Sequence, residues 1–323
     1  MIPIVSAALA FAVLAGHAAP AVAEDYPARP LRIVVPYPAG GTSDILARSI
    51  GQKLSESLGQ PIVVENKPGA NGNVGADLVA KAPPDGYTLL LADIGALAIS
   101  PSVYPTLPFD PTKDFAPVTM VAYSPHILVV HPAVAASSVK ELIALAKAKP
   151  GKLNFAISGV GGAPHLAGVD FALRTGIDWA YIPYKGGSQA IADVAGGQAD
   201  VTMNGMLATY PLVQGGKLKL LAVSSARRMG AIPDVPTLAE SGLAGFESGS
   251  WQGVVAPAGT PRNVVARLNA EITRIVNSPE MRDNLGKQGA DVRTNTPDEF
   301  AAFIRGEKMK WAKVVKDANV KID

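Results

Sequence analysis

The sequence predicts an α/β protein with two lobes and a cleft between them. Short apolar runs rich in β-branched residues, such as 31–35 and 127–130, alternate with segments whose apolar residues recur every three or four positions. That alternation is typical of a parallel sheet covered by helices. A chain of 323 residues also exceeds the size that one hydrophobic core usually serves, so we expect two lobes.

The expected strands follow one another along the whole chain. They comprise residues 31–35, 62–64, 87–91, 127–130, 153–157, 181–182 and 218–223. An apolar stripe over 46–58 marks the first helix, and a capping box of Ser138 and Glu141 starts another. Thr-Pro pairs at 260–261 and 296–297 begin two late helices.

Two extended segments interrupt this alternation, at 126–132 and 251–257, and each ends in a proline. We interpret them as paired crossovers that form a hinge. Lobe 1 would then comprise residues 24–125 plus 251–323, and lobe 2 residues 126–250. The alternative is that both segments are ordinary strands of one larger domain.

The N-terminus resembles an export signal. Residues 1–23 carry no charged side chain, and an apolar stretch over 2–16 precedes small residues at Ala21 and Ala23. We expect cleavage near Ala23 and export of the remaining chain. No basic residue follows Met1, which suggests a start codon further upstream. A buried N-terminal helix is the alternative reading.

Composition excludes several classes of function. The net charge is +2, from 29 Lys and Arg against 27 Asp and Glu, and no basic run exists to follow a nucleic-acid backbone. The chain has no cysteine, so we expect neither lipid attachment nor disulfides. No second uncharged stretch reaches the length of a membrane span, so we do not expect an integral transporter subunit.

Four glycine-rich turns, at 36–44, 69–75, 158–165 and 184–189, follow expected strands and open expected helices. Ligands of open α/β sheets bind where strand ends meet helix N-termini, because unpaired N–H groups there favour an anion. The turns 36–44 and 158–165 contain no Lys or Arg, so we expect recognition by backbone amides, hydroxyls and water. For any single turn, a mere tight connection is the alternative.

Candidate ligand-binding residues lie mainly in these turns, with Asp93 just after the strand at 87–91 and Asn204 in addition. They are Tyr37, Ala39, Gly40, Gly41, Asp44, Asn71, Asp93, Ser158, Gly159, Gly162, His165, Tyr184 and Asn204. Asp44 and Asp93 could instead cap the helices that begin beside them, and His165 could instead cap its own loop.

Enzymatic patterns are weak. The sequence lacks H-E-x-x-H and G-x-S-x-G motifs, and Ser188 stands in only an imperfect nucleophile elbow. His126, His131 and His165 are too scattered for a metal site, and Pro164 breaks a dinucleotide-binding glycine pattern. We therefore expect a binding protein with no catalytic residue, metal or cofactor. A hydrolase or transferase stays open as the less favoured alternative.

The segment 26–44 resembles a family motif, Tyr-Pro-x-[Arg/Lys]-Pro followed by an apolar strand, Pro-[Tyr/Phe], Gly-Gly and Asp. Further motifs of the same family are matched at 64–72, 84–89, 162–166, 184–187, 196–200 and 233–240. The chain is thus similar to the Bug family, the extracytoplasmic solute receptors of tripartite tricarboxylate transporters.

The resemblance implies a fold like that of type II periplasmic binding proteins, two α/β lobes joined by two hinge strands. It implies a monomer in the periplasm that closes on a small carboxylate or carboxylate-amide, held partly through water, and delivers it to integral membrane transporter subunits. A ligand-sensing protein for a membrane signalling system is the alternative. Asp93 departs from the family, which has Ser or Thr there, and this disfavours a plain dicarboxylate.

Overall fold

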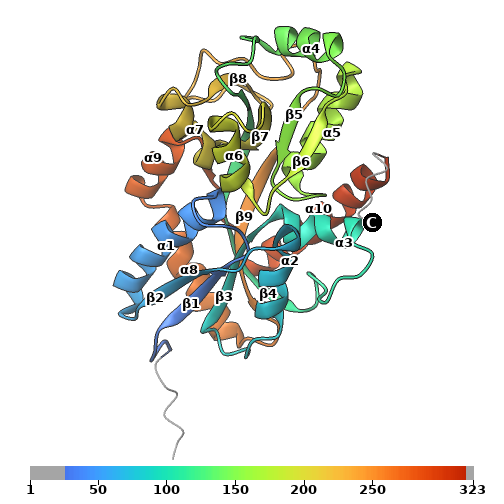
Figure 1. Ribbon diagram of the computed structural model, residues 1–323. Coiled ribbons are helices and arrows are strands. Elements are labelled where there is room, and N and C mark those ends of the chain that lie inside the picture. Colours follow the sequence, from blue (N-terminus) through green and yellow to red (C-terminus); the bar gives the residue numbers. More distant parts are fainter. Residues whose placement is uncertain (1–25, 318–323) are drawn as a thin grey trace, which may run out of the picture.

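The computed structural model describes residues 26–317, which form two α/β lobes (Figure 1). The expected export signal at 1–23 lies outside the described residues. The predicted fold class is confirmed, since each lobe is a sheet covered by helices. Of the predicted strands, all fall within one or two residues of the observed ones except that at 127–130, which is the end of a longer strand at 115–130.

The first lobe is built on a parallel core of three strands in the order β2, β1, β3, to which β9 adds in the antiparallel direction. Its strands are β1 (Leu31–Val35), β2 (Ile62–Asn66), β3 (Thr88–Asp93), β9 (Gly249–Pro257) and the short β10 (Asp291–Val292). Its helices are α1 (Thr42–Leu58), η1 (Ala70–Gly72), α2 (Asn73–Ala80), η2 (Gly95–Ile99), α3 (Ser100–Val103), α8 (Arg262–Val276), α9 (Pro279–Lys287) and α10 (Pro297–Asp317).

The second lobe has a smaller mixed sheet. Its strands are β5 (Asn154–Ile157), β6 (Ala180–Pro183), β7 (Val201–Gly205) and β8 (Lys219–Val223). Its helices are α4 (Val139–Ala148), α5 (Ala163–Thr175), α6 (Gly187–Ala195) and α7 (Met206–Gln214). In Figure 1 these helices gather in the upper, green to yellow half of the molecule.

One long strand, β4 (Phe115–Val130), belongs to both sheets. Its first part pairs with β9, and its last five residues pair with β7 and β8. Pro125 stands opposite Gly249, so the change from one sheet to the other falls at Pro125 and His126. The segment 249–257 lies in the sheet of the first lobe. The exact lobe limits at residues 126 and 250 stay a prediction.

Local sequence explains why the elements around the cleft form where they do. In α1, Leu46, Ile50 and Leu54 are fully buried and pack in the same core as β1. Each such side chain contributes about 2 kcal/mol when it leaves water. Ser138 accepts a hydrogen bond from the backbone N–H of Glu141 at 3.2 Å, which confirms the predicted cap of α4.

Candidate functional site

The two lobes touch where the glycine-rich turns face each other. A Cβ atom built on Gly186 would lie 2.3 Å from Cδ of Pro38, and one built on Gly205 would lie 2.7 Å from Oγ1 of Thr42. Real carbon atoms do not approach this closely without displacement. Glycine at these positions therefore allows a close approach of the second lobe to the turn at 36–44.

A cavity of about 50 Å³ lies beside these contacts. Residues from both lobes line it: Tyr37, Gly41, Thr42, Ser43, Asp93, Ser158, Pro164, Gly187, Asn204, Gly205, Ser250 and Gln252. The space admits a few water molecules or one small polar group.

Four helices begin at this cavity. The residues before their first turns are Gly41 for α1, Gly162 for α5, Gly186 for α6 and Gly205 for α7, and these glycines have no side chain to cap the helices. In α7 the N–H of Leu207 instead donates to Oγ of Ser124 at 3.3 Å. Free N–H groups and positive dipole ends therefore converge from both lobes, which favours an anion. No Lys or Arg is among the described residues that line the cavity, in keeping with the expected recognition by backbone amides.

Two buried amide groups of the cavity wall also lack protein partners. Asn204 is 6% exposed and its Nδ2 donates to no acceptor, while Gln252 is 1% exposed and its Oε1 accepts from no donor. An unsatisfied buried polar atom costs about 1–3 kcal/mol, so such atoms are rare unless water or a ligand satisfies them. Together with the helix N-termini, they make the cavity the candidate site for a polar ligand.

Asp93 bonds to the start of η2 and also lines the cavity. Its Oδ1 accepts a hydrogen bond from the backbone N–H of Gly95 at 2.7 Å, at the start of η2, and another from the hydroxyl of Tyr37. Its side chain also faces the cavity. Burial raises the pKa of Asp93 to about 6, although the hydrogen bonds from Tyr37 and Gly95 favour the ionised form.

Asp44 lies behind the turn and does not line the cavity. It accepts hydrogen bonds from the N–H of Gly40 at 2.9 Å, from Arg48 at 3.0 Å and from Asn66 at 2.9 Å. Burial opposes its ionisation, but these hydrogen bonds outweigh that effect and lower the pKa of Asp44. Asp44 is also not the N-cap of α1, which is Gly41, and its hydrogen bonds instead order the turn before the helix.

Asn71 forms a second contact between the lobes. It has a left-handed backbone conformation, with φ of 54°. Its Oδ1 would lie 3.3 Å from a Cβ built on Gly159 and 2.9 Å from one built on Gly162. These three predicted residues thus meet one another beside the cavity, but they do not line it.

The remaining predicted residues point elsewhere. His165 accepts a hydrogen bond at Nδ1 from the N–H of Gly161 at 3.0 Å, which is the loop-capping alternative, and burial lowers its pKa to about 4. Tyr184 packs against the core of the second lobe, and its pKa is raised to about 12, first by burial and then by Asp193. Ala39 is exposed on the turn.

Seven lining residues were not named from the sequence: Thr42, Ser43, Pro164, Gly187, Gly205, Ser250 and Gln252. The first four fall inside turns that were recognised. Ser250 and Gln252 alternate along β9, and two polar residues on one face of a buried strand are the signal that would have indicated them.

His126 links the cavity to the change of sheet in β4. Its Nδ1 lies 2.7 Å from Oγ of Ser248, and its Nε2 lies 3.3 Å from Oγ of Ser250, which lines the cavity. Burial lowers the pKa of His126 to about 3, so the ring is neutral at pH 7.

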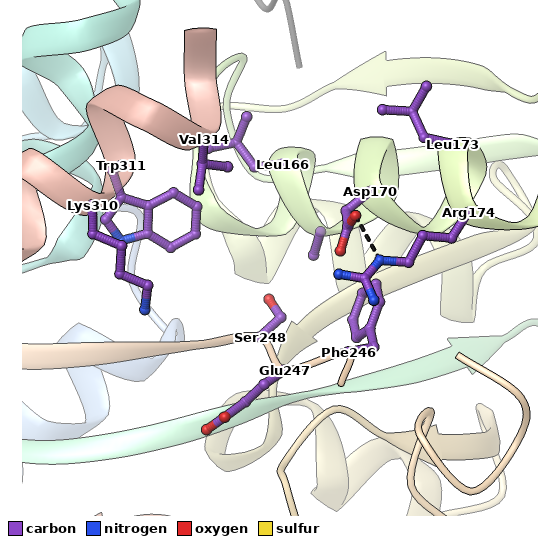
Figure 2. A pocket seen from close by; sticks show the side chains of 11 residues that line it. Leu166, Asp170, Leu173, Arg174, Phe246, Glu247, Ser248, Lys310, Trp311 and Val314 are labelled. Carbon is purple, nitrogen blue, oxygen red and sulfur yellow. Dashed lines mark hydrogen bonds and ion pairs between the residues drawn. The ribbon is translucent and has the colours of Figure 1, made fainter. Parts of the chain in front are cut away.

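A larger groove of about 350 Å³ lies outside the cleft, between α5 and α10. Figure 2 shows Trp311 of α10 facing the groove, and Arg174 paired with Asp170 along α5. Of the predicted site residues, none lines this groove. Over residues 26–317 we found no cluster of three potential metal ligands and no helix both long and apolar enough to cross a bilayer.

Comparison with known proteins points to one family. The family model described as "Tripartite tricarboxylate transporter family receptor" matches residues 46–320. Protein BugT of Bordetella pertussis is 40% identical over 313 residues, which covers 97% of this chain and 96% of BugT.

Two solved structures share the fold over most of the chain. An R. palustris protein with adipate is 36% identical with a TM-score of 0.90, covering 92% of this chain and 100% of its own. MatC from Rhodopseudomonas palustris with bound malate is 32% identical with a TM-score of 0.85, covering 90% of this chain and 100% of its own.

Proposed function

This chain belongs to the tripartite tricarboxylate transporter family of receptors, which are periplasmic solute-binding proteins and not enzymes, and we propose on that basis that it captures a small carboxylate between its lobes and delivers it to a membrane transporter. The ligand would enter while the lobes are apart and would occupy the cavity at their interface once they close.

One observation carries the proposal: the N-termini of α1, α5 and α6, which no side chain caps, and the unpartnered Nδ2 of Asn204 meet at one cavity. A carboxylate has enough lone pairs to accept from several of these donors at once. Hydrogen bonds to a charged acceptor contribute about 1.5–3 kcal/mol each, so a few of them can bind an anion without a salt bridge.

The ligands of similar proteins support the choice of an organic acid. One similar structure holds adipate and another holds malate, and both ligands are carboxylates. Transfer to integral membrane subunits follows from the family and rests on no contact seen in this chain. We further propose that the protein is exported by cleavage near Ala23 and works as a monomer whose lobes divide at about residues 126 and 250.

Calorimetry with a panel of small acids tests the binding step. We expect binding of at least one mono- or dicarboxylate and none of the matching neutral diamides or diols, because only an anion satisfies the convergent donors. Equal affinity for a neutral analogue would contradict the proposal. Small-angle scattering with a bound acid should show contraction, and an unchanged radius of gyration would remove lobe closure from the mechanism.

Transport is tested separately in cells that express the receptor together with the two membrane subunits. We expect uptake of the identified acid to require the receptor. If uptake stays the same without it, the delivery step is wrong even though binding is real, and a sensory role then takes its place.

A further inference from the structure

The cavity contains acceptors as well as donors, and these come from different elements. The donors are the free N–H groups at the start of α1 and the Nδ2 of Asn204. The acceptors are the carboxylate of Asp93 and the Oε1 of Gln252. A carboxylate satisfies the first group, but it cannot satisfy the second.

Asp93 and Gln252 lie side by side. They are directly opposite each other in the antiparallel pair of β3 and β9, so their side chains emerge on the same face of the sheet. Asp93 accepts hydrogen bonds from Tyr37 and Gly95, both at Oδ1, and the backbone N–H of Ala96 also stabilises its ionised form. The Oε1 of Gln252 has no donor at all. A ligand group placed here meets two hydrogen-bond acceptors.

No cation of the surrounding elements neutralises Asp93. In the turn before α1 it meets Tyr37, whose own pKa is raised, first by burial and then by the charge of Asp93. In α1, Asp44 is paired with Arg48. On the other elements around the cavity, His126 of β4 and His165 of α5 are neutral at pH 7, because burial lowers the pKa of each.

We propose that Asp93, together with Gln252, recognises a hydrogen-bond-donating group of the ligand. The receptor therefore binds a carboxylate that carries an ammonium or amide N–H group more tightly than a plain dicarboxylate. This inference rests on the proposed function and specifies its ligand class. A second carboxylate about 5 Å from an ionised Asp93 would be repelled enough to lower affinity about a hundredfold at an effective dielectric constant of 20. An ammonium group at the same place would be attracted.

The preference must change with pH, and in opposite directions for the two ligand types. Burial holds the pKa of Asp93 at about 6, so Asp93 is mostly ionised at pH 8 and half protonated at pH 6. A dicarboxylate should bind more tightly at pH 6 than at pH 8, by about 25-fold, and take up a proton on binding. An ammonium compound should bind about twofold more weakly at pH 6, since half of the free protein has then lost the charge.

Ligands matched in length make the test. Succinate, its monoamide succinamate and β-alanine share one carboxylate and spacer and differ only in the second group, which is anionic, neutral or cationic. Adipate, its monoamide and 5-aminopentanoate form the same series at a greater length. Each is titrated by calorimetry at pH 6 and pH 8, in two buffers of different ionisation enthalpy so that proton uptake is measured directly.

The variant Asp93→Asn removes the charge and retains an Oδ1 acceptor for Tyr37 and Gly95. We expect it to lower the affinity ratio of the ammonium ligand to the dicarboxylate by more than about a hundredfold at pH 8, because it removes both the repulsion of the one and the attraction of the other, and to abolish the opposite pH responses. Asp77→Asn is the matched control, because Asp77 lies on α2, pairs with Lys81 and does not line the cavity. It should leave the ratio unchanged.

The outcomes separate the two proposals. If ligands of a series bind but the ratio and pH responses are the same in wild type and Asp93→Asn, the inference is wrong while carboxylate binding stands. The same holds if Asp77→Asn shifts the ratio as much as Asp93→Asn does. If no ligand of either series binds, although a melting curve shows that the protein is folded, the proposed function fails and the inference fails with it.

Discussion

The two lobes contribute different chemistry to the cavity. The second lobe supplies Ser158, Pro164, Gly187, Asn204 and Gly205, none of which can ionise near neutral pH. The first lobe supplies Asp93 and its partner Tyr37, and it orders its turn with the network around Asp44. One side therefore offers neutral donors, and the other side carries a charge whose state depends on pH.

This difference separates two properties of a binding site, its affinity for anions and its selectivity among them. Neutral amides and helix N-termini accept any anion of suitable size, because they respond to charge and not to the shape of the remaining molecule. A buried carboxylate repels a second anion and attracts a hydrogen-bond donor, so it discriminates between ligands of similar size. We expect changes in the second lobe to alter affinity for all ligands, and changes at Asp93 to alter their ranking.

Gly186→Ala should have the largest effect on binding. The backbone of Gly186 is extended, so alanine fits the local conformation, but its Cβ would lie 2.3 Å from Pro38 of the other lobe. We expect the lobes to be held apart and affinity for every ligand to fall more than a hundredfold. Calorimetry measures the affinity, and scattering measures the remaining contraction.

Gly230→Ala is the control for this experiment, since a Cβ at Gly230 would meet no atom within 4 Å. It should leave both affinity and contraction unchanged. A full contraction in Gly186→Ala would show that the contact with Pro38 does not limit closure.

Asp93→Asn should stabilise the ligand-free protein at neutral pH. The pKa of Asp93 is raised from 3.8 to about 6 in the folded state, so ionisation of Asp93 destabilises the folded protein. The contribution of protonated Asp93 to stability is fully present below pH 3.8 and is lost as the pH rises through 6. The free energy of unfolding of the variant should exceed that of wild type by up to about 3 kcal/mol at pH 8.

That gain should disappear near pH 4, where Asp93 is protonated in wild type as well. Urea unfolding at pH 4, 6 and 8 measures it. An equal difference at all three pH values would mean that packing, and not charge, causes the change.

Asn204→Ala should weaken the binding of all carboxylates by about 2 kcal/mol, roughly thirtyfold in affinity, with no change in the order of their affinities. Its Nδ2 has no partner within the protein, but its Oδ1 accepts from the N–H of Gly205 at 3.0 Å, so folding should lose about 1 kcal/mol, and unfolding in urea provides the check. Asn204→Asp keeps the shape but replaces the donor by a negative group. If that variant still binds carboxylates as well as wild type, the donor at this position does not contact the ligand.

Asp44→Ala should have the smallest effect, a loss of about 1 kcal/mol in unfolding free energy and a few-fold loss of affinity. Asp44 orders the turn by accepting from Gly40 and Asn66, but it does not line the cavity. Unfolding and calorimetry on one preparation measure both effects. A loss of affinity as large as that of Gly186→Ala would place Asp44 in the binding site itself.

Much of the fold could be predicted because it depends on local patterns. The strand at 31–35, the stripe of α1 and the cap at Ser138 are each read from neighbouring residues, and the structure confirms them. Strand β7 and the first part of β4 were missed. The first contains Asn204 and Gly205, and the second contains Pro117 and Pro125, so neither reads as an ordinary strand.

The site was predicted less completely than the fold. The turns were recognised from their glycines, and Tyr37, Gly41, Asp93, Ser158 and Asn204 of the predicted set line the cavity. Asp44 and His165 lie in the right turns, but their side chains bond to their own loops. The direction of a side chain inside a turn depends on which backbone groups are free nearby, and composition does not contain that information.

By itself, the sequence determined the α/β class, the positions of the glycine-rich turns and the family, because these depend on periodicity, on residues tolerated in tight turns and on motifs. Only the tertiary structure decided that Gln252 stands opposite Asp93 and that Gly186 and Gly205 admit the other lobe. Strand register and the approach of two lobes join residues that are far apart in the chain. The physical reason is that burial and unpartnered atoms, which define this cavity, exist only once those distant segments have packed together.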